Sequence, residues 1–218
     1  MTFSSVENDI ISESFPGKIV KTVPLYFYEE FPTIANDFGN RNSIMFVGGF
    51  AHTPNIDAVS WFCREVLPLV HKAVPDLTLK VIGSNPPSEI RRLASDHVKI
   101  LGFVTDEQLK QHYDNSRLVV IPLRFGAGVK GKTIEAMYHG LPIVSTSIGI
   151  EGIPEIASII SPADEAEDFA RQVIEMYQSP ENLEEASRKN RDFLSDRYNA
   201  GAAQKCIQEI FTEIGTEK

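Results

Sequence analysis

Hydrophobic positions along the chain fall into short continuous runs separated by longer amphipathic stretches. The runs are rich in β-branched residues and bounded by polar or turn-forming residues, so they predict buried strands. They are Ser43–Val47, Leu77–Ile82, Val98–Leu101, Leu118–Ile121, Pro142–Thr146 and Ile156–Ile160. Strands that alternate with helices are typical of a parallel sheet covered on both faces. The predicted fold class is therefore α/β, a three-layer α/β/α domain with a mostly parallel sheet of about six strands.

The stretches between and after these runs carry apolar residues at helical spacing. The predicted helices are Asn55–Val74, Pro87–Ser95, Asp106–Asn115, Lys132–His139, Ala163–Gln178, Glu181–Arg197 and Ala200–Ile214. Pro68 lies inside the first of them and should kink or shorten it, because proline lacks the amide hydrogen that a helix interior needs.

The first forty residues follow a different pattern. "GKIVKTVPLYFYEEFP" contains one credible strand and then a piece rich in proline and aromatic residues. We therefore expect residues 1–40 to be a connector that enters a domain at 41–218, with its hydrophobic residues packed on that domain or on a neighbour.

Composition excludes several classes of protein. The 218 residues are 42% hydrophobic and 23% charged, and no run reaches the roughly 18 apolar residues of a membrane span. The start, MTFSSVENDIISESF, has neither the basic nor the apolar region of a signal peptide, so a cytoplasmic protein is expected. A net charge of −9 disfavours nucleic acid as a partner. Cys63 and Cys206 have no ligand-like neighbours and are expected to be buried thiols.

The segment "GAGVKGKT", Gly126 to Thr133, matches the phosphate-binding pattern of P-loop nucleotidases. A P-loop, however, leaves its strand directly and needs an aspartate at the end of a second strand for Mg²⁺. Here four residues, Pro122 to Phe125, separate the strand from the glycines, and the next strand, PIVST, ends in hydroxyls. An ATP- or GTP-binding P-loop protein is kept as an alternative.

A glycine-rich turn that runs into a helix still favours a phosphate group, because it presents free amides and the positive end of the helix dipole. Lys130 and Lys132 add positive charge there, and Glu135 lies one turn into the helix, where its carboxylate could accept two hydrogen bonds from a ribose diol. The combination suggests a nucleoside diphosphate. The other interpretation of the same residues is a tight turn with solvent-facing lysines and a surface glutamate.

The order of motifs resembles a known family. "VVIPLRFGAGVKGKTIEAMYHGLPIVSTSIGIEGI" looks like the donor-binding segment of the retaining GT-B glycosyltransferases of the glycosyl transferases group 1 family. "IMFVGGFAHTPNIDAVSWF", "LTLKVIGSNP" and "VKILGFVTDEQLKQHYDNSRLVVIP" resemble the preceding strands and turns of that family, in the same order. The resemblance spans Ser43 to Gly152 and implies a Rossmann-like domain, one half of a GT-B fold.

The resemblance also implies roles for individual residues in binding a nucleotide-sugar donor. Glu135 matches the glutamate that holds the ribose hydroxyls, and Gly128-Val129-Lys130 match the amides that face the diphosphate and sugar. Phe103-Val104 match the turn beside the nucleobase, and Gly48-Gly49 match the glycine turn at the mouth of the cleft. Lys132, Thr133 and Arg124 complete the substrate-binding candidates. No catalytic residue and no metal ligand is assigned.

The sequence departs from the family pattern at several positions. Many relatives carry a second glutamate eight positions before Glu135, where this chain has Ala127. Many also carry an arginine and a lysine on the diphosphate, at the positions of Gly49 and Asn55. Lys130, Lys132 or Arg124 could supply the lost charge, since a similar loop occurs in one branch of the family.

Such enzymes have two Rossmann-like halves, and the resemblance covers one. Residues 1–40 resemble the end of the N-terminal lobe and the connector between lobes, so an N-terminal acceptor lobe is the expected partner. The predicted protein is then the donor-binding half of a glycosyltransferase, inactive alone, that acts on a glycan or lipid-linked acceptor, as in polysaccharide biosynthesis. Its location would be cytoplasmic or peripheral at the inner membrane face.

No cofactor is expected besides the donor substrate, and no D-x-D triplet occurs in the sequence, so donor binding is predicted to be independent of metal. His52, just after the glycine turn, is the one histidine that is a candidate for the cleft, and the other four are expected to be structural. A non-catalytic module with this fold, which would bind a partner protein, is the further alternative.

Overall fold

A five-stranded parallel sheet forms the centre of the protein. The computed structural model describes residues 2–23, 27–33 and 37–216. The strands are β1 (Ser43–Val47), β2 (Thr78–Ile82), β3 (Val98–Gly102), β4 (Leu118–Ile121) and β5 (Ile143–Ser145). Their order is β3-β2-β1-β4-β5. Most strand residues are buried, as expected for a parallel sheet with both faces covered.

The register aligns the carboxyl ends of the strands at one edge. β1 pairs with β2 from Ser43↔Thr78 to Val47↔Ile82, and with β4 at Ile44↔Leu118. From β1 the chain adds β2 and β3 on one side, and then crosses to add β4 and β5 on the other. The boundary between β1 and β4 is therefore the topological switch point, where open α/β sheets bind their ligands.

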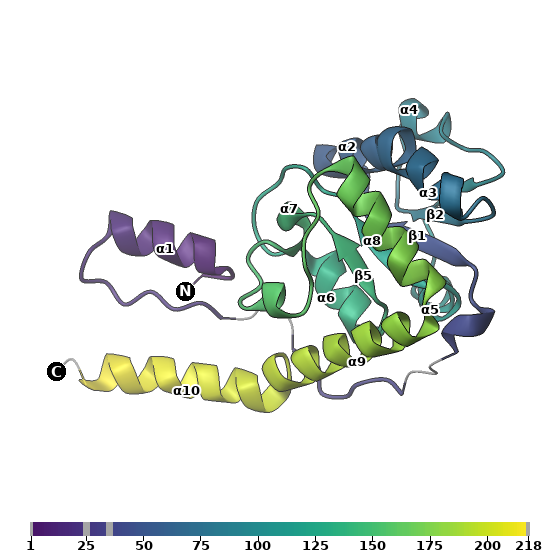
Figure 1. Ribbon diagram of the computed structural model, residues 1–218. Helices are drawn as coiled ribbons and strands as arrows, with labels where there is room; N and C mark the ends of the chain where they lie inside the picture. The colour runs from purple at the N-terminus through teal and green to yellow at the C-terminus, as the bar shows by residue number, and fades with distance from the viewer. Residues whose placement is uncertain (1, 24–26, 34–36, 217–218) are drawn as a thin grey trace.

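Helices cover both faces of the sheet, which confirms the predicted three-layer α/β/α architecture (Figure 1). On one face, α2 (Thr53–Trp61), α3 (Leu67–Ala73) and α8 (Ala166–Gln178) pack together, with Trp61 edge-on to Phe169 at 5.7 Å. On the other face, α5 (Asp106–Asn115) meets the end of α6 (Gly131–Tyr138), where Tyr113 stacks on His139 at 4.2 Å. The remaining helices of the domain are α4 (Ser88–Arg91), α7 (Ser147–Ile150), α9 (Pro180–Arg197) and α10 (Ala200–Thr216).

The long helix predicted around Pro68 is interrupted. A π-helical turn, Phe62–Val66, joins α2 to α3, and the Leu67 amide donates to the Phe62 carbonyl five residues back. Pro68 then stands in the first turn of α3, where no amide hydrogen is needed. This turn spans five residues, one more than an α-helical turn, and in this way the helix accommodates the proline.

The predicted strand Ile156–Ile160 is wrong. Ile156–Ser158 forms a 3₁₀ turn that begins after Glu155, whose backbone is left-handed with φ 61°. Ile156 and Ile160 are buried, whereas Ala157 and Ser158 are exposed. Burial at positions four apart follows a helical turn, not the alternation of a strand, so the β-branched composition of this segment was misleading.

The N-terminal segment holds a helix that the sequence analysis missed, α1 (Ser5–Ser14). The strand predicted in "GKIVKTVPLYFYEEFP" is absent from its described residues, where Thr22 and Tyr28 make only isolated bridges, with Thr2 and Asn199 respectively; residues 24–26 lie outside the described part. Tyr28 and Phe31 pack against the domain core, as expected for the connector. α1 and α10 both extend to the same side of the sheet domain (Figure 1).

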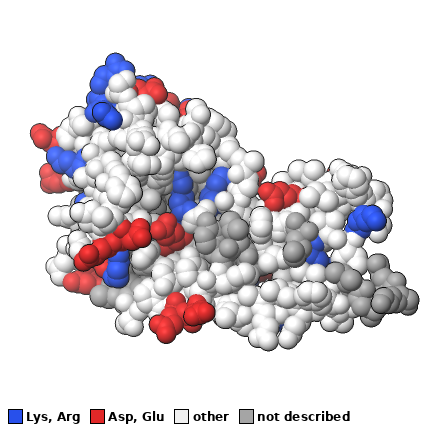
Figure 2. Space-filling model, turned by 180° about the vertical axis from the view of Figure 1, so that it is seen from behind, with Lys and Arg blue, Asp and Glu red and all other residues white. Residues whose placement is uncertain are grey.

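The expectations from composition concern surface charge, membrane-spanning segments and the two cysteines. On the face drawn in Figure 2, Lys and Arg side chains stand in small separate groups, not in one broad basic area. Among the helices described, none is long and apolar enough to cross a membrane. Cys63 and Cys206 are free and half-buried, and burial raises the pKa of the Cys63 thiol to about 12. That thiol is unreactive at neutral pH.

Candidate functional site

The candidate site lies at the carboxyl edge of the sheet, on the two loops that flank the switch point. Gly48 and Gly49 follow β1, and residues 122–130 lead from β4 into α6. The glycine turn is held against the end of β2, since the Gly48 amide donates to the Ile82 carbonyl at 2.9 Å. The structure therefore brings together two segments that are far apart in sequence, at the edge where open α/β sheets in general bind their ligands.

The glycine turn is tightly packed on its inner side. A Cβ on Gly48 would lie 2.7 Å from the Lys132 Nζ and 2.9 Å from the Asn55 side chain. Gly49 has more room, with the Ser84 Oγ at 3.5 Å from the corresponding position. The absence of a side chain at Gly48 thus leaves space for the ammonium of Lys132 beneath the turn.

The loop after β4 delivers the start of α6 to this edge. Gly128 has φ 77°, a left-handed conformation that suits glycine, and Lys130 is the N-cap residue of α6. No side chain among the described residues caps this helix. The Thr133 amide donates to the Lys130 carbonyl at 2.9 Å. The amides of Gly131 and Lys132, together with the positive end of the helix dipole, are therefore the groups available to an anion.

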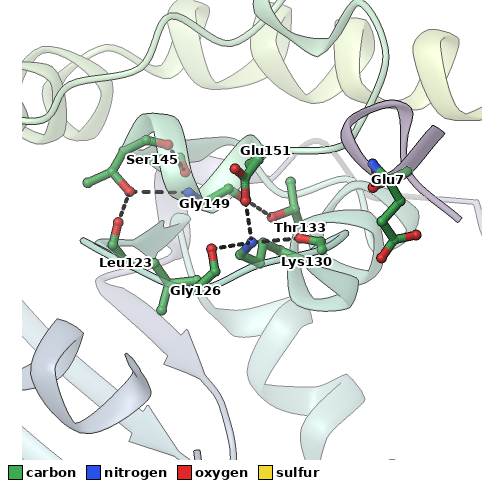
Figure 3. Close-up of polar contacts among 11 residues, drawn as sticks. Glu7, Leu123, Gly126, Lys130, Thr133, Ser145, Gly149 and Glu151 are labelled. Carbon is green, nitrogen blue, oxygen red and sulfur yellow. Dashed lines mark hydrogen bonds and ion pairs between the residues drawn. The ribbon is translucent and has the colours of Figure 1, made fainter. Parts of the chain in front are cut away.

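Lys130 stabilises this loop from within. Its Nζ donates to the Gly128 carbonyl at 2.6 Å and pairs with Glu151 at 3.2 Å, while only 9% of its side chain is exposed (Figure 3). Val129 is half-buried beside Gly152, where a Cβ would lie 3.3 Å from the Val129 Cγ2. These contacts fix the shape of the turn whose amides were predicted to face the donor.

Arg124, at the other end of the loop, forms a two-point ion pair with Asp57 of α2. Its Nε and one terminal nitrogen donate to the two carboxylate oxygens at 2.9 and 2.5 Å. The guanidinium also lies 5.7 Å from the ring centroid of Trp61. The pair ties the loop to α2.

Thr133 is a structural residue of α6. Its side chain is fully buried, and its hydroxyl donates to the Gly149 carbonyl at 2.6 Å (Figure 3). In a P-loop the corresponding hydroxyl would face Mg²⁺. The hydrogen bond to α7 directs the Thr133 hydroxyl into the core, which weighs against the P-loop alternative.

We expect Thr133→Val to destabilise the fold by about 1–2 kcal/mol, because the Gly149 carbonyl would be left buried without its donor. Urea unfolding followed by circular dichroism measures this effect. Thr133→Ser keeps the hydroxyl and serves as the matched control. The interpretation fails if Thr133→Val is as stable as wild type, or if Mg²⁺ stabilises wild type and not the variant.

Glu135 and Lys132 line a cavity of about 470 Å³ on the exposed side of α6. Its other lining residues are Tyr28, Gly131, Tyr138 and His139. Burial raises the pKa of the Glu135 carboxyl, and the neighbouring Tyr113 hydroxyl lowers that pKa by a smaller amount. Glu135 thus faces an open recess one turn beyond the start of the helix, the position at which a ribose is predicted.

The wall of this cavity includes a residue from the connector. Tyr28 stacks on Tyr138, with ring centroids 4.1 Å apart, and its amide donates to the Tyr198 carbonyl at 2.8 Å. From the sequence this segment was expected only to pack on the domain or on a neighbour, and it was not assigned to the site. Its aromatic composition was the available signal.

Phe103, Val104 and His52 lie at the same edge of the sheet, outside this cavity lining. Phe103 follows β3 and is 77% exposed, whereas Val104 is half-buried. His52 is exposed and precedes α2, next to the glycine turn. An aromatic ring this exposed at a loop end is free to stack on a flat ligand.

α1 also approaches this loop, a contact that the sequence did not predict. A Cβ on Gly128 would lie 4.0 Å from the Glu7 carboxylate, and one on Gly152 would lie 3.1 Å from the Ser4 side chain. Glu7 thus reaches the loop from the side (Figure 3). The sequence Ser4-x-x-Glu7 has the spacing of a helix capping box, which could have revealed the helix.

Comparison with known proteins agrees with the family resemblance and with the fold. The family model for glycosyl transferases group 1 matches residues 41–179. A curated relative from Klebsiella pneumoniae, described as an uncharacterized 44.6 kDa protein in the cps region, is 28% identical over 185 residues. The match covers 81% of this chain and 47% of the relative, so the chain spans about half the relative's length.

Solved structures share the fold at low sequence identity. S. aureus TarM, crystallised in a complex that includes UDP, matches with a TM-score of 0.76 at 15% identity, over 96% of this chain and 43% of TarM. Anabaena HepE in complex with UDP-glucose matches with a TM-score of 0.68 at 14% identity, over 97% and 63% of the two chains. The C-terminal domain of LpcC from Francisella tularensis matches with a TM-score of 0.56 at 16% identity, over 80% and 97%.

Proposed function

Because this chain belongs to the glycosyl transferases group 1 family, we propose that it is the donor-binding half of a glycosyltransferase that uses a nucleoside-diphosphate sugar. The observation that carries the proposal is the convergence of the Gly48-Gly49 turn, the uncapped start of α6 and the Glu135 carboxylate at the switch point of the sheet. TarM and HepE, which share this fold, were solved with UDP or UDP-glucose, and this supports the same class of ligand.

Each part of the site would recognise one part of the donor. The amides at the start of α6 and the positive charge beside them suit the diphosphate. Glu135 would accept hydrogen bonds from the ribose hydroxyls, and the exposed Phe103 ring, next to Val104, would border the base. Gly48 and Gly49 would let the diphosphate approach the backbone closely.

In the transfer reaction, negative charge develops on the leaving diphosphate. Preorganised amides and a lysine at the helix start can stabilise that charge, a role that a metal ion plays in other enzymes. We propose that donor binding here needs no metal. The acceptor, a glycan or a lipid-linked glycan, would be held by a second lobe, because catalysis requires both reactants to be held in register. By itself the chain should bind donor without transferring sugar.

A thermal-shift panel tests this function. We expect UDP, GDP or ADP, or one of their sugar conjugates, to raise the melting temperature by about 5 °C or more at about 100-fold excess over Kd, with EDTA present. The matching nucleoside, which lacks the diphosphate, is the control and should raise it far less.

Two outcomes would contradict the proposal. Stabilisation by ATP or GTP only in the presence of Mg²⁺ would favour a P-loop protein. No stabilisation by any nucleotide, together with unchanged amide NMR signals from Gly128 to Glu135, would favour a non-catalytic module.

A further inference from the structure

Three cations stand near the start of α6, and their contacts differ. Arg124 is paired at two points with Asp57. Lys130 is paired with Glu151 and with the Gly128 carbonyl. An incoming diphosphate would have to compete with a carboxylate for either group. Both are therefore poorly placed to act as the principal phosphate ligand.

Lys132 has no such competitor. Among the described residues, no carboxylate pairs with its ammonium, which donates to the neutral Asn55 Oδ1 at 2.5 Å. The ammonium also lies 4.4 Å from the ring centroid of Phe46. It sits beneath the Gly48 turn and lines the same cavity as Glu135. It is thus a positive charge at the predicted diphosphate position, without a negative partner.

Asn55 holds this ammonium in place. Its Nδ2 donates to the Gly49 carbonyl at 2.7 Å, and this contact turns the Oδ1 toward Lys132. Asn55 is buried, with 7% of its surface exposed. The amide therefore links the glycine turn after β1 to the lysine on α6, and it fixes the position of both.

We propose that Lys132 is the principal cation that binds the donor diphosphate, that Asn55 is its positioning residue, and that Lys132 takes up a proton when the donor binds. The proposal rests on the proposed function and specifies which residue supplies the charge. In this chain the lysine on α6 would replace the cations expected at positions 49 and 55, where Gly49 and Asn55 stand.

The surroundings of Lys132 explain the proton uptake. Burial, and to a smaller extent the charge of Lys130, lower the pKa of Lys132 to about 7. The titratable groups that share its cavity are Glu135 and His139 of α6, together with the phenols of Tyr28 and Tyr138. A bound diphosphate would favour the charged form of the lysine and raise its pKa. By linkage, donor affinity should then fall as pH rises above about 7.

Isothermal titration calorimetry with UDP-glucose, GDP-mannose and ADP-glucose tests this idea, because their diphosphate diesters do not titrate near neutral pH. For the conjugate that binds, we expect wild-type affinity to fall about tenfold between about pH 7 and about pH 9. The heat of binding near pH 8 should also depend on the ionisation heat of the buffer, as proton uptake requires.

Substitutions at Lys132, Asn55 and Arg124 measure how much each side chain contributes to donor affinity. At about pH 7, Lys132→Met should bind about 30-fold more weakly than wild type and show no pH dependence above about pH 7. Asn55→Ala should weaken binding less than Lys132→Met, and so should Arg124→Met. The matched control is Lys99→Met, which removes an exposed lysine on β3. Lys132→Met removes a partly buried charge but leaves the buried Asn55 Oδ1 without its donor. A cooperative melting transition, at or a few degrees below that of wild type, checks that the variant folds.

The same measurements distinguish a failure of the role proposed for Lys132 from a failure of donor binding itself. If wild type binds a donor with pH-independent affinity, or if Lys132→Met binds as tightly as wild type, the role of Lys132 is overturned while donor binding stands. If wild type binds none of the three conjugates, both are overturned.

Discussion

Replacing Gly83 with alanine is expected to destabilise the protein by about 3 kcal/mol or more and to abolish donor binding. Gly83 follows β2, and a Cβ there would lie 2.0 Å from the Gly48 carbonyl oxygen and 2.7 Å from its carbon. Both atoms belong to backbone, so neither can move aside as a flexible side chain would. The glycine turn would have to leave the end of β2, and the space around Lys132 would change with it. Urea unfolding and donor titration measure the two effects.

Gly39→Ala is the matched control for this substitution. Nothing lies within 4 Å of a Cβ at Gly39, and its backbone is not left-handed. We expect its stability to remain within about 1 kcal/mol of wild type. If Gly83→Ala were equally mild, the close approach between the end of β2 and the glycine turn would be wrong, and with it the geometry of the site.

Replacing Glu135 with alanine is expected to weaken binding of the donor nucleotide about 100-fold, or about 2.7 kcal/mol. Hydrogen bonds between a carboxylate and two ribose hydroxyls are charge-assisted and therefore strong. Glu135 lines the cavity near the start of α6, and among the described residues no lysine or arginine forms an ion pair with its carboxylate. Calorimetry with the nucleoside diphosphate that wild type binds provides the measurement.

A double-mutant cycle isolates the ribose contact. The 2′,3′-dideoxy form of the same nucleotide should bind wild type and Glu135→Ala with affinities within about threefold of each other, because the partner hydroxyls are gone. Glu184→Ala, an exposed glutamate on α9, controls for the change in net charge. A 100-fold loss that persists with the dideoxy nucleotide would show that Glu135 acts through another part of the ligand or through the fold.

Local sequence determined most of the secondary structure. The runs that became β1 and β4 are apolar on consecutive residues, as expected for strands that are buried on both faces of a parallel sheet. α5 has the predicted bounds, and its start is fixed by a capping box of Thr105 and Gln108, a signal contained in four neighbouring residues. Where the local signal was ambiguous, prediction failed: Ile156–Ile160 has strand composition and forms a turn.

The sequence by itself also placed the glycine turn, the α6 helix start and Glu135 at one edge of the sheet, because parallel strands align their carboxyl ends. It could not choose among Arg124, Lys130 and Lys132, which lie close together in sequence and carry the same charge. Only the tertiary structure distinguishes them, since their partners Asp57, Glu151 and Asn55 come from distant parts of the chain. The physical reason is that charge is a property of the residue, whereas its availability to a ligand depends on which groups folding brings within a few ångströms of it.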